Sequence, residues 1–142
     1  MNVAADASVL VAESLRRRRH RLIGHQDVVF YIAEPTWSEV VHEIGRRLDA
    51  MVVHGRFQAT DRELVLGDTL ALLTQHITVV PVAEYQEHEA AARARIPRDP
   101  NDWPTVAVAL VLDADIWTMD YDFFGCGLPV WTTDTLMTHM DT

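Results

Sequence analysis

The sequence predicts an α/β fold: a three-layer α/β/α arrangement around a mainly parallel central sheet of four to five strands. Short apolar, β-branched segments alternate with segments of helical length and helical periodicity along the whole chain. Such alternation favours parallel pairing, because each connecting helix crosses a face of the sheet. Of the 142 residues, 49% are hydrophobic and 23% are charged, which suits one compact domain spanning residues 1–142.

The first half of the chain contains two predicted strands. The apolar run Val3–Asp6 predicts a strand, and the periodic apolar residues after it predict a helix that ends in the run Arg16–Arg19. Val28–Ala33 has the β-branched and aromatic composition of a buried strand. Helices are then expected from about Trp37 to Val53 and from Thr60 to about Gln75, each opened by capping-box spacing.

The second half repeats the alternation. Ile77–Val80 predicts a strand and Val82–Arg95 an alanine- and glutamate-rich helix. Two prolines and an asparagine then break the chain, and an apolar helix is expected from Asp102 to Leu112. Short strands are expected at Ile116–Thr118 and, after a glycine-containing turn, at Val130–Thr132.

Composition excludes several classes of function. All twelve basic residues are arginine, which excludes chemistry built on a lysine, such as a P-loop or a Schiff base. The net charge of −9 argues against a broad electrostatic nucleic-acid binder. Cys126 is the only cysteine, so neither a disulfide nor a cysteine zinc cluster forms within the chain. With no membrane-length apolar run and no signal peptide over Met1–Ala12, a cytoplasmic protein is expected.

Four acids from distant parts of the sequence are predicted to meet at one edge of the sheet. Asp6 ends the first strand, Asp120 follows the fourth, and Glu39 and Asp102 lie in the first turns of helices. Parallel strands end, and their connecting helices begin, on the same edge, where α/β proteins usually bind ligands. If the first and fourth strands flank the point where strand order reverses, Asp6 and Asp120 become neighbours.

Carboxylates held close together repel one another, and they either share protons or bind a divalent cation. Hard oxygen ligands suit Mg²⁺ or Mn²⁺ better than zinc. Such ions assist hydrolysis of a phosphate ester, so this reaction class is the prediction.

Each acid also has a purely structural interpretation. Glu39 has capping-box spacing from Thr36, and Asp102 could be a helix N-cap. Asp120 could be a turn residue after a strand. Asp6 is harder to explain in this way, because a carboxylate that ends an apolar strand is costly to bury unpaired. The functional hypothesis depends on the convergence of all four acids.

Four segments of the chain resemble, in order, the motifs of the PIN-domain family. They are VAADASVLVAE with Asp6 and Ser8, PTWSEVVHEI with Glu39, DWPTVAVAL with Asp102, and TMDYDFF with Asp120 and Asp122. The resemblance implies a Mg²⁺- or Mn²⁺-dependent endoribonuclease acting on single-stranded RNA, often the VapC-type toxin of a toxin–antitoxin pair. It implies that Asp6, Glu39, Asp102 and Asp120 hold the metal, with Ser8, Thr118 and Asp122 in support. One or two ions are compatible with four carboxylates. An antitoxin partner and a homodimer are expected from the resemblance alone.

The arginines and histidines are further candidates for substrate or metal binding. Arg93, Arg95 and Arg98 approach Asp102 in sequence and are candidates for holding substrate phosphates. The Arg16–Arg19 run lies about 15 Å beyond Ser8 along the predicted helix, which favours a helix terminus or a partner surface over RNA contact. The seven histidines lack zinc-protease spacing.

Two other functions remain open at this point. A non-catalytic PIN-like scaffold that binds RNA or a protein partner would fit the negative net charge. A phosphatase acting on small phosphoesters would use the same carboxylates.

Overall fold

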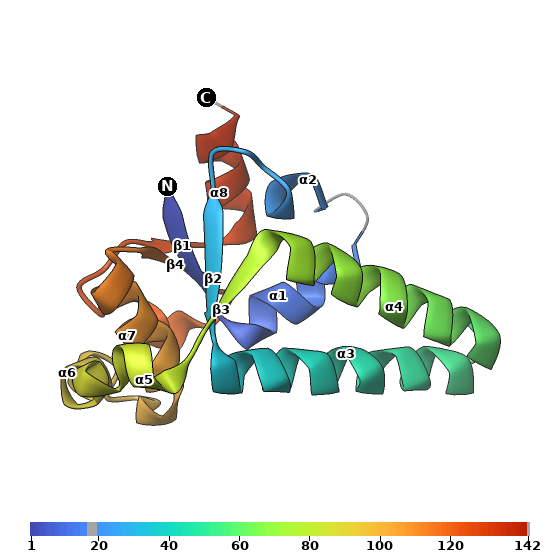
Figure 1. Ribbon diagram of the computed structural model, residues 1–142, viewed down its shortest axis with the longest axis horizontal. Coiled ribbons are helices and arrows are strands. Elements are labelled where there is room, and N and C mark those ends of the chain that lie inside the picture. The colour runs from blue at the N-terminus through green and yellow to red at the C-terminus, as the bar shows by residue number, and fades with distance from the viewer. Residues whose placement is uncertain (17–19, 142) are drawn as a thin grey trace.

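The computed structural model describes residues 1–16 and 20–141 and has a wholly parallel, five-stranded sheet at its centre (Figure 1). The strand order is β3-β2-β1-β4-β5. The strands are β1 (Asn2–Ala5), β2 (Val29–Ala33), β3 (Ile77–Val80), β4 (Asp115–Trp117) and β5 (Val130–Trp131). All five lie at predicted positions, and their number agrees with the predicted four to five.

Helices cover both faces of this sheet. The α-helices are α1 (Ala7–Ser14), α2 (His20–Ile23), α3 (Glu34–Val53), α4 (Ala59–His76), α5 (Val82–Tyr85), α6 (Glu89–Arg95), α7 (Trp103–Leu112) and α8 (Thr133–Met140). The described part of the chain also has short 3₁₀ turns at η2 (Gln86–His88), η3 (Pro100–Asp102) and η4 (Tyr121–Phe123). Within the described residues, no helix combines the length and the apolar character needed to cross a membrane.

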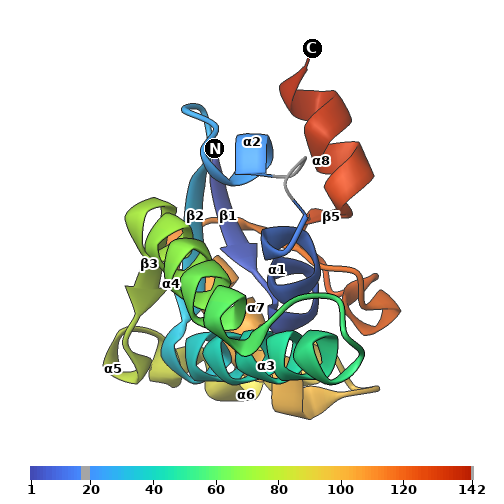
Figure 2. The same ribbon diagram turned by 90° about the vertical axis from the view of Figure 1, so that its right-hand side faces the viewer.

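The two faces of the sheet bury separate apolar cores, because successive strand side chains point to opposite sides. Val3 of β1 packs with Leu10 and Ile44 in the core under α1 and α3. Its neighbour Ala4 packs with Val106 in the core under α7. Figures 1 and 2 show α5, α6 and α7 on one side of the sheet and α1, α3 and α4 on the other. The predicted three-layer α/β/α fold is confirmed.

Helix boundaries differ from the prediction in two places where capping boxes were expected. Helix α3 begins at Glu34, with Ala33 as its N-cap and Pro35 in the first turn, so the predicted Thr36–Glu39 capping box does not open it. Helix α4 begins at Ala59, where Gln58 and Asp61 form the capping box instead of the predicted Thr60 and its partner.

One further helix prediction was wrong, and one helix was not predicted. The single helix expected over Val82–Arg95 is divided into α5, η2 and α6. The C-terminal helix α8 was not predicted, although Thr132 caps it through the backbone N–H of Thr135. The predicted arginine-rich end of the first helix falls partly on residues 17–19, which lie outside the described residues.

The strand order reverses between β1 and β4, which are hydrogen-bonded neighbours. Ala5 pairs with Trp117, and the backbone N–H of Asp6 donates to the Trp117 carbonyl at 3.0 Å. The chain therefore delivers Asp6 and the residues that follow β4 to the same point at the carboxyl edge, as the sequence predicted.

Candidate metal centre

A cleft of about 310 Å³ opens at this edge, between helices α1 and α3. Ala7, Ser8 and Val11 line it from α1, and three α3 residues line it from the other side. The cleft is lined by Asp6, Ala7, Ser8, Val11, Glu39, Glu43, Arg47, Asp102 and Asp120. All four acids singled out in the sequence therefore border one cavity.

Asp6 is held firmly at the floor of the cleft. It is only 8% exposed, and its Oδ2 accepts hydrogen bonds from the Ser8 hydroxyl at 2.8 Å and the Thr118 hydroxyl at 2.9 Å. Burial raises the pKa of the Asp6 carboxyl, and the negative charge of Asp120 raises it further. The hydrogen bonds from the two hydroxyls and from the Ala7 backbone N–H lower this pKa and so oppose the rise. The hydroxyls orient this carboxylate through one oxygen only.

Asp120 is presented by a tight turn directly after β4. Its backbone N–H donates to the Thr118 hydroxyl at 2.9 Å, and its Oδ1 accepts the backbone N–H of Asp122 at 2.9 Å. Thr118 thus connects Asp6 and Asp120 through one buried side chain. The turn function considered for Asp120 is real, yet it occupies one oxygen and the carboxylate still borders the cleft.

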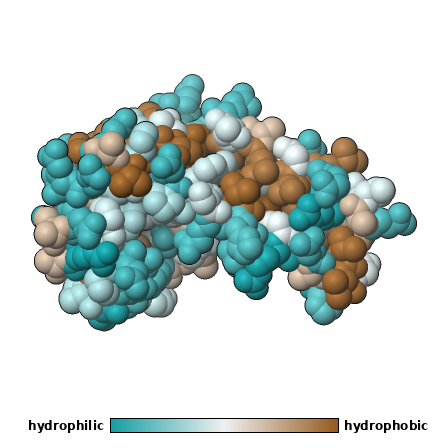
Figure 3. Space-filling view, turned by 60° about the horizontal axis from the view of Figure 1, so that its bottom comes forward, coloured by the Kyte–Doolittle hydropathy of each residue, from teal (hydrophilic) through white to brown (hydrophobic). Residues whose placement is uncertain are grey.

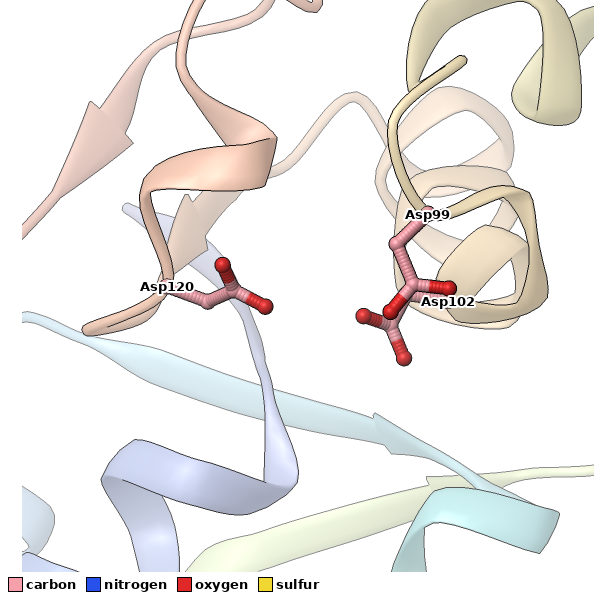
Figure 4. A group of neighbouring side chains, drawn as sticks. All are labelled: Asp99, Asp102 and Asp120. Atoms are coloured by element: carbon pink, nitrogen blue, oxygen red, sulfur yellow. The ribbon is translucent and has the colours of Figure 1, made fainter.

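The closest group of acids joins Asp120 to the loop before α7. One carboxylate oxygen from each of Asp99, Asp102 and Asp120 lies within 4.8 Å of the others. Figure 4 shows the Asp120 carboxylate facing Asp99 and Asp102 across a gap. The pKa of Asp102 is raised to about 7. The largest cause is burial, followed by the charges of Asp6 and Asp99, a hydrogen bond to the Asp99 side chain and the charge of Asp120. The raised pKa of Asp102 reflects a cluster of negative charges that has no cation beside it among the described residues.

In the described part of the chain, neither Glu39 nor Asp102 caps a helix through its side chain. Asp102 stands at the N-cap of α7, yet within the described part of the chain its side chain makes no capping hydrogen bond there. Glu39 lies in the second turn of α3, beyond the capping position, and is exposed on the cleft wall. Both carboxylates are available to the cleft.

The three arginines proposed as phosphate ligands all contact the protein itself. Arg93 pairs with Glu89 at 3.0 Å and lies over the Trp103 ring, 5.6 Å from its centroid. Arg95 donates to the Cys126 carbonyl at 2.8 Å. None of the three lines the cleft among the described residues.

Arg98 joins the two loops that carry the acids. It donates to the Tyr121 and Phe124 carbonyls at 3.0 and 3.2 Å and lies 3.5 Å from Asp122. A substrate contact for this residue stays a prediction.

Sequence reasoning missed Asp99, Glu43 and Arg47. Asp99 lies in the proline-rich loop, and nothing in the sequence alone shows that the η3 turn brings it beside Asp102. The positions of Glu43 and Arg47 beside Glu39 could have been predicted from the sequence. They follow Glu39 at intervals of four residues, the spacing of one face of a helix.

The donor set of the cleft fits a hard divalent cation. Clustered carboxylate oxygens are the ligands that Mg²⁺ and Mn²⁺ prefer, and a cation would replace the proton that the raised pKa of Asp102 favours. A zinc site built from cysteine is ruled out, because the lone Cys126 is buried in the other core.

Comparison with known proteins agrees with the fold. A family model described as the PIN domain matches residues 4–141. The crystal structure of PAE2754 from Pyrobaculum aerophilum has a TM-score of 0.67 at 19% identity, over 99% of this chain and 90% of that one. FitAcB from Neisseria gonorrhoeae has a TM-score of 0.55 at 16% identity, over 92% of this chain and 97% of that one. No curated protein matches the chain.

Proposed function

The chain belongs to the PIN-domain family, and from this membership and the carboxylate cluster we propose that it is a Mg²⁺- or Mn²⁺-dependent endoribonuclease acting on single-stranded RNA. PIN domains are generally nucleases. The observation that carries the proposal is the approach of Asp99, Asp102 and Asp120 within 4.8 Å, on a cleft whose floor is Asp6.

Asp6, Glu39, Asp102 and Asp120 would hold the cation, directly or through water, and Asp99 adds a fifth carboxylate beside them. A divalent ion bound there would supply charge neutralisation for a phosphodiester and acidify a water molecule. One or two ions are compatible with this number of oxygens.

The protein's own contribution is to orient these oxygens. Ser8 and Thr118 both bind Oδ2 of Asp6, and no hydroxyl of the described residues donates to Oδ1. Asp122 fixes one oxygen of Asp120 through its backbone N–H. With its pKa raised to about 7, Asp102 keeps its proton below neutral pH and would release it as a cation binds. Ser8, Thr118 and Asp122 are therefore proposed to support the ligands.

The test uses purified protein and a labelled single-stranded RNA. We expect cleavage with Mn²⁺ or Mg²⁺, none in EDTA, and a loss of at least about a hundredfold in Asp6→Asn and Asp120→Asn. Asp68→Asn is the matched control, because Asp68 is an exposed acid on α4, away from the cleft. Equal cleavage in EDTA by protein free of contaminating nuclease would exclude the mechanism.

The net charge of −9 favours one second candidate, a non-catalytic scaffold that binds RNA or a protein partner. Calorimetric titration with Mn²⁺ separates the two. A nuclease site should give a saturable heat that disappears in Asp6→Asn, whereas a scaffold should give none.

A toxin role in the cytoplasm, with a cognate antitoxin, is proposed from the family resemblance. Figure 3 shows hydrophobic side chains gathered over the half of the molecule in which α3 and α4 project, and Val53 and Leu64 on these helices are 81% and 67% exposed. Exposed apolar surface of this kind supports a protein partner or a homodimer. Sedimentation measures the oligomeric state, and a neighbouring gene for a small DNA-binding protein would support the antitoxin.

A further inference from the structure

We propose that Arg47 binds a backbone phosphate of the substrate strand several nucleotides away from the carboxylate cluster, and so makes binding depend on substrate length. This inference rests on the proposed function, since it assigns the position of the RNA strand in the same cleft. It concerns a residue that the sequence motifs do not include.

The position of Arg47 follows from the periodicity of α3. Val40, Ile44 and Leu48 form the buried stripe of this helix. The residue before each of them, at positions 39, 43 and 47, forms a second stripe beside the buried one, and all three line the cleft. Arg47 therefore stands at the far end of the wall that begins with Glu39.

The charge of the cleft explains why this position needs a cation. Five carboxylates line the cavity, and Arg47 is the one basic residue among the described residues that do. A divalent ion would offset the charge only near the cluster, because mobile ions screen exposed charges beyond about 10 Å. The rest of an anionic strand would meet Glu43, and Arg47 is placed to hold it.

Among the described residues, Arg47 also differs from the nearby arginines in having no ion-pair partner. Arg46 pairs with Glu43 at 3.1 Å, and Arg62 pairs with Asp49 at 3.0 Å. Among the described residues no ion pair or side-chain hydrogen bond involves Arg47, which is exposed. An exposed arginine without a partner, on the wall of an acidic cleft, is available for a phosphate.

The length of the wall sets the expected reach. Eight residues separate Glu39 from Arg47, which corresponds to a rise of about 12 Å along α3. At about 3.4 Å for each stacked nucleotide, that is roughly three to four nucleotides. A dinucleotide covers about one such step of 3.4 Å, whereas an octanucleotide covers the whole length of the wall.

The experiment compares an octanucleotide and a dinucleotide as substrates for the wild type, Arg47→Ala and Arg47→Lys. For the octanucleotide, Arg47→Ala should raise KM about tenfold with a change in kcat below about threefold, and should lower the slope of log affinity against log salt by about 0.7. For the dinucleotide, the same substitution should have a much smaller effect on KM. Arg47→Lys should restore part of the octanucleotide affinity, because it keeps the charge.

Arg56→Ala is the matched control, since Arg56 is exposed, carries the same charge and lies outside the cleft. If the wild type cleaves RNA and Arg47→Ala behaves like Arg56→Ala, the inference is overturned and the proposed function stands. An equal loss for both substrates would also overturn it, by showing a general structural effect. If the wild type cleaves nothing, the proposed function fails. The anisotropy of a labelled octanucleotide then decides the role of Arg47 separately, since equal affinities of wild type and Arg47→Ala would overturn it.

Discussion

Asp102 shows how the fold converts a surface acid into a group that titrates near neutrality. In an unfolded chain this side chain ionises near 3.8, whereas in the folded protein burial and the charges of Asp6 and Asp99 raise its pKa to about 7. The native state therefore keeps a proton that the unfolded state releases. A metal ion that bound to this carboxylate would have to displace the proton, so its affinity would depend on pH.

The first prediction is that Asp102→Asn alters the pH dependence of stability. Because the folded pKa is raised, the free energy of unfolding in EDTA should fall as pH rises from about 4 to about 7. The amide that replaces the carboxyl in this variant carries no charge, so the variant should differ least from the wild type near pH 4 and exceed its Tm by several degrees at about pH 8. Thermal melts at both pH values measure this. A Tm difference that stays constant with pH would contradict the assigned cause.

At the residue scale, the sequence showed the acids that lie next to recognisable strand and helix ends. Asp6 and Asp120 were predictable because each follows a buried strand, and strand ends of a parallel sheet converge. Asp99 was not, because its approach to Asp102 depends on the φ and ψ angles of a single 3₁₀ turn. Hydrophobic periodicity carries no information about such a turn.

At the scale of elements, the site depends on two loops that are far apart in sequence. The loop before α7 supplies Asp99 and Asp102, and the turn after β4 supplies Asp120. Arg98 spans them through the Tyr121 and Phe124 carbonyls. Its main function in the structure is thus to fix the separation of the two loops.

We predict that Arg98→Ala weakens metal binding more than it weakens the fold. Arg98 is exposed, so loss of its two hydrogen bonds should lower the stability by about 1 kcal/mol. The Kd for Mn²⁺ should rise roughly tenfold, as is typical when a residue that orients metal ligands is removed. Calorimetry measures the affinity and thermal melts the stability.

The control for this prediction is Arg21→Ala, which removes an exposed ion pair with Asp141 away from both loops. It should leave the affinity for Mn²⁺ unchanged. An equal loss of affinity in both variants would mean that net charge, and not the loop separation, controls binding.

The elements predicted from sequence were those with a strong periodic or compositional signal. The five strands and the long helices α3 and α4 fall in this group. The division of Val82–Arg95 into α5, η2 and α6 was missed, because alanine and glutamate favour a helix whatever the tertiary contacts require. Tyr85, fully buried against Trp103, shows such a contact at the division. Helix α8 was missed because its eight residues are largely polar.

At the scale of the molecule, the site brings together acids from four parts of the chain that are far apart in sequence. Asp6 follows β1, Asp120 follows β4, and Asp99 and Asp102 precede α7, while Glu39 comes from α3. The like charges of these acids repel one another, and this repulsion destabilises the folded state of a protein whose net charge is already −9. A cation bound at this junction would remove that repulsion and would bind the native state alone, because the unfolded chain does not bring these acids together.

The final prediction follows from this linkage. Mn²⁺ at about a hundred times its Kd should stabilise the fold by about 2.7 kcal/mol, which for a domain of this size raises Tm by about 10 °C. Asp6→Asn should lose most of the shift and Asp68→Asn should keep it, since only the first borders the cleft. Differential scanning fluorimetry with increasing Mn²⁺ measures the effect. Because any ligand specific to the native state must raise Tm, a wild-type Tm that does not move in millimolar Mn²⁺ would show that the carboxylates hold no ion.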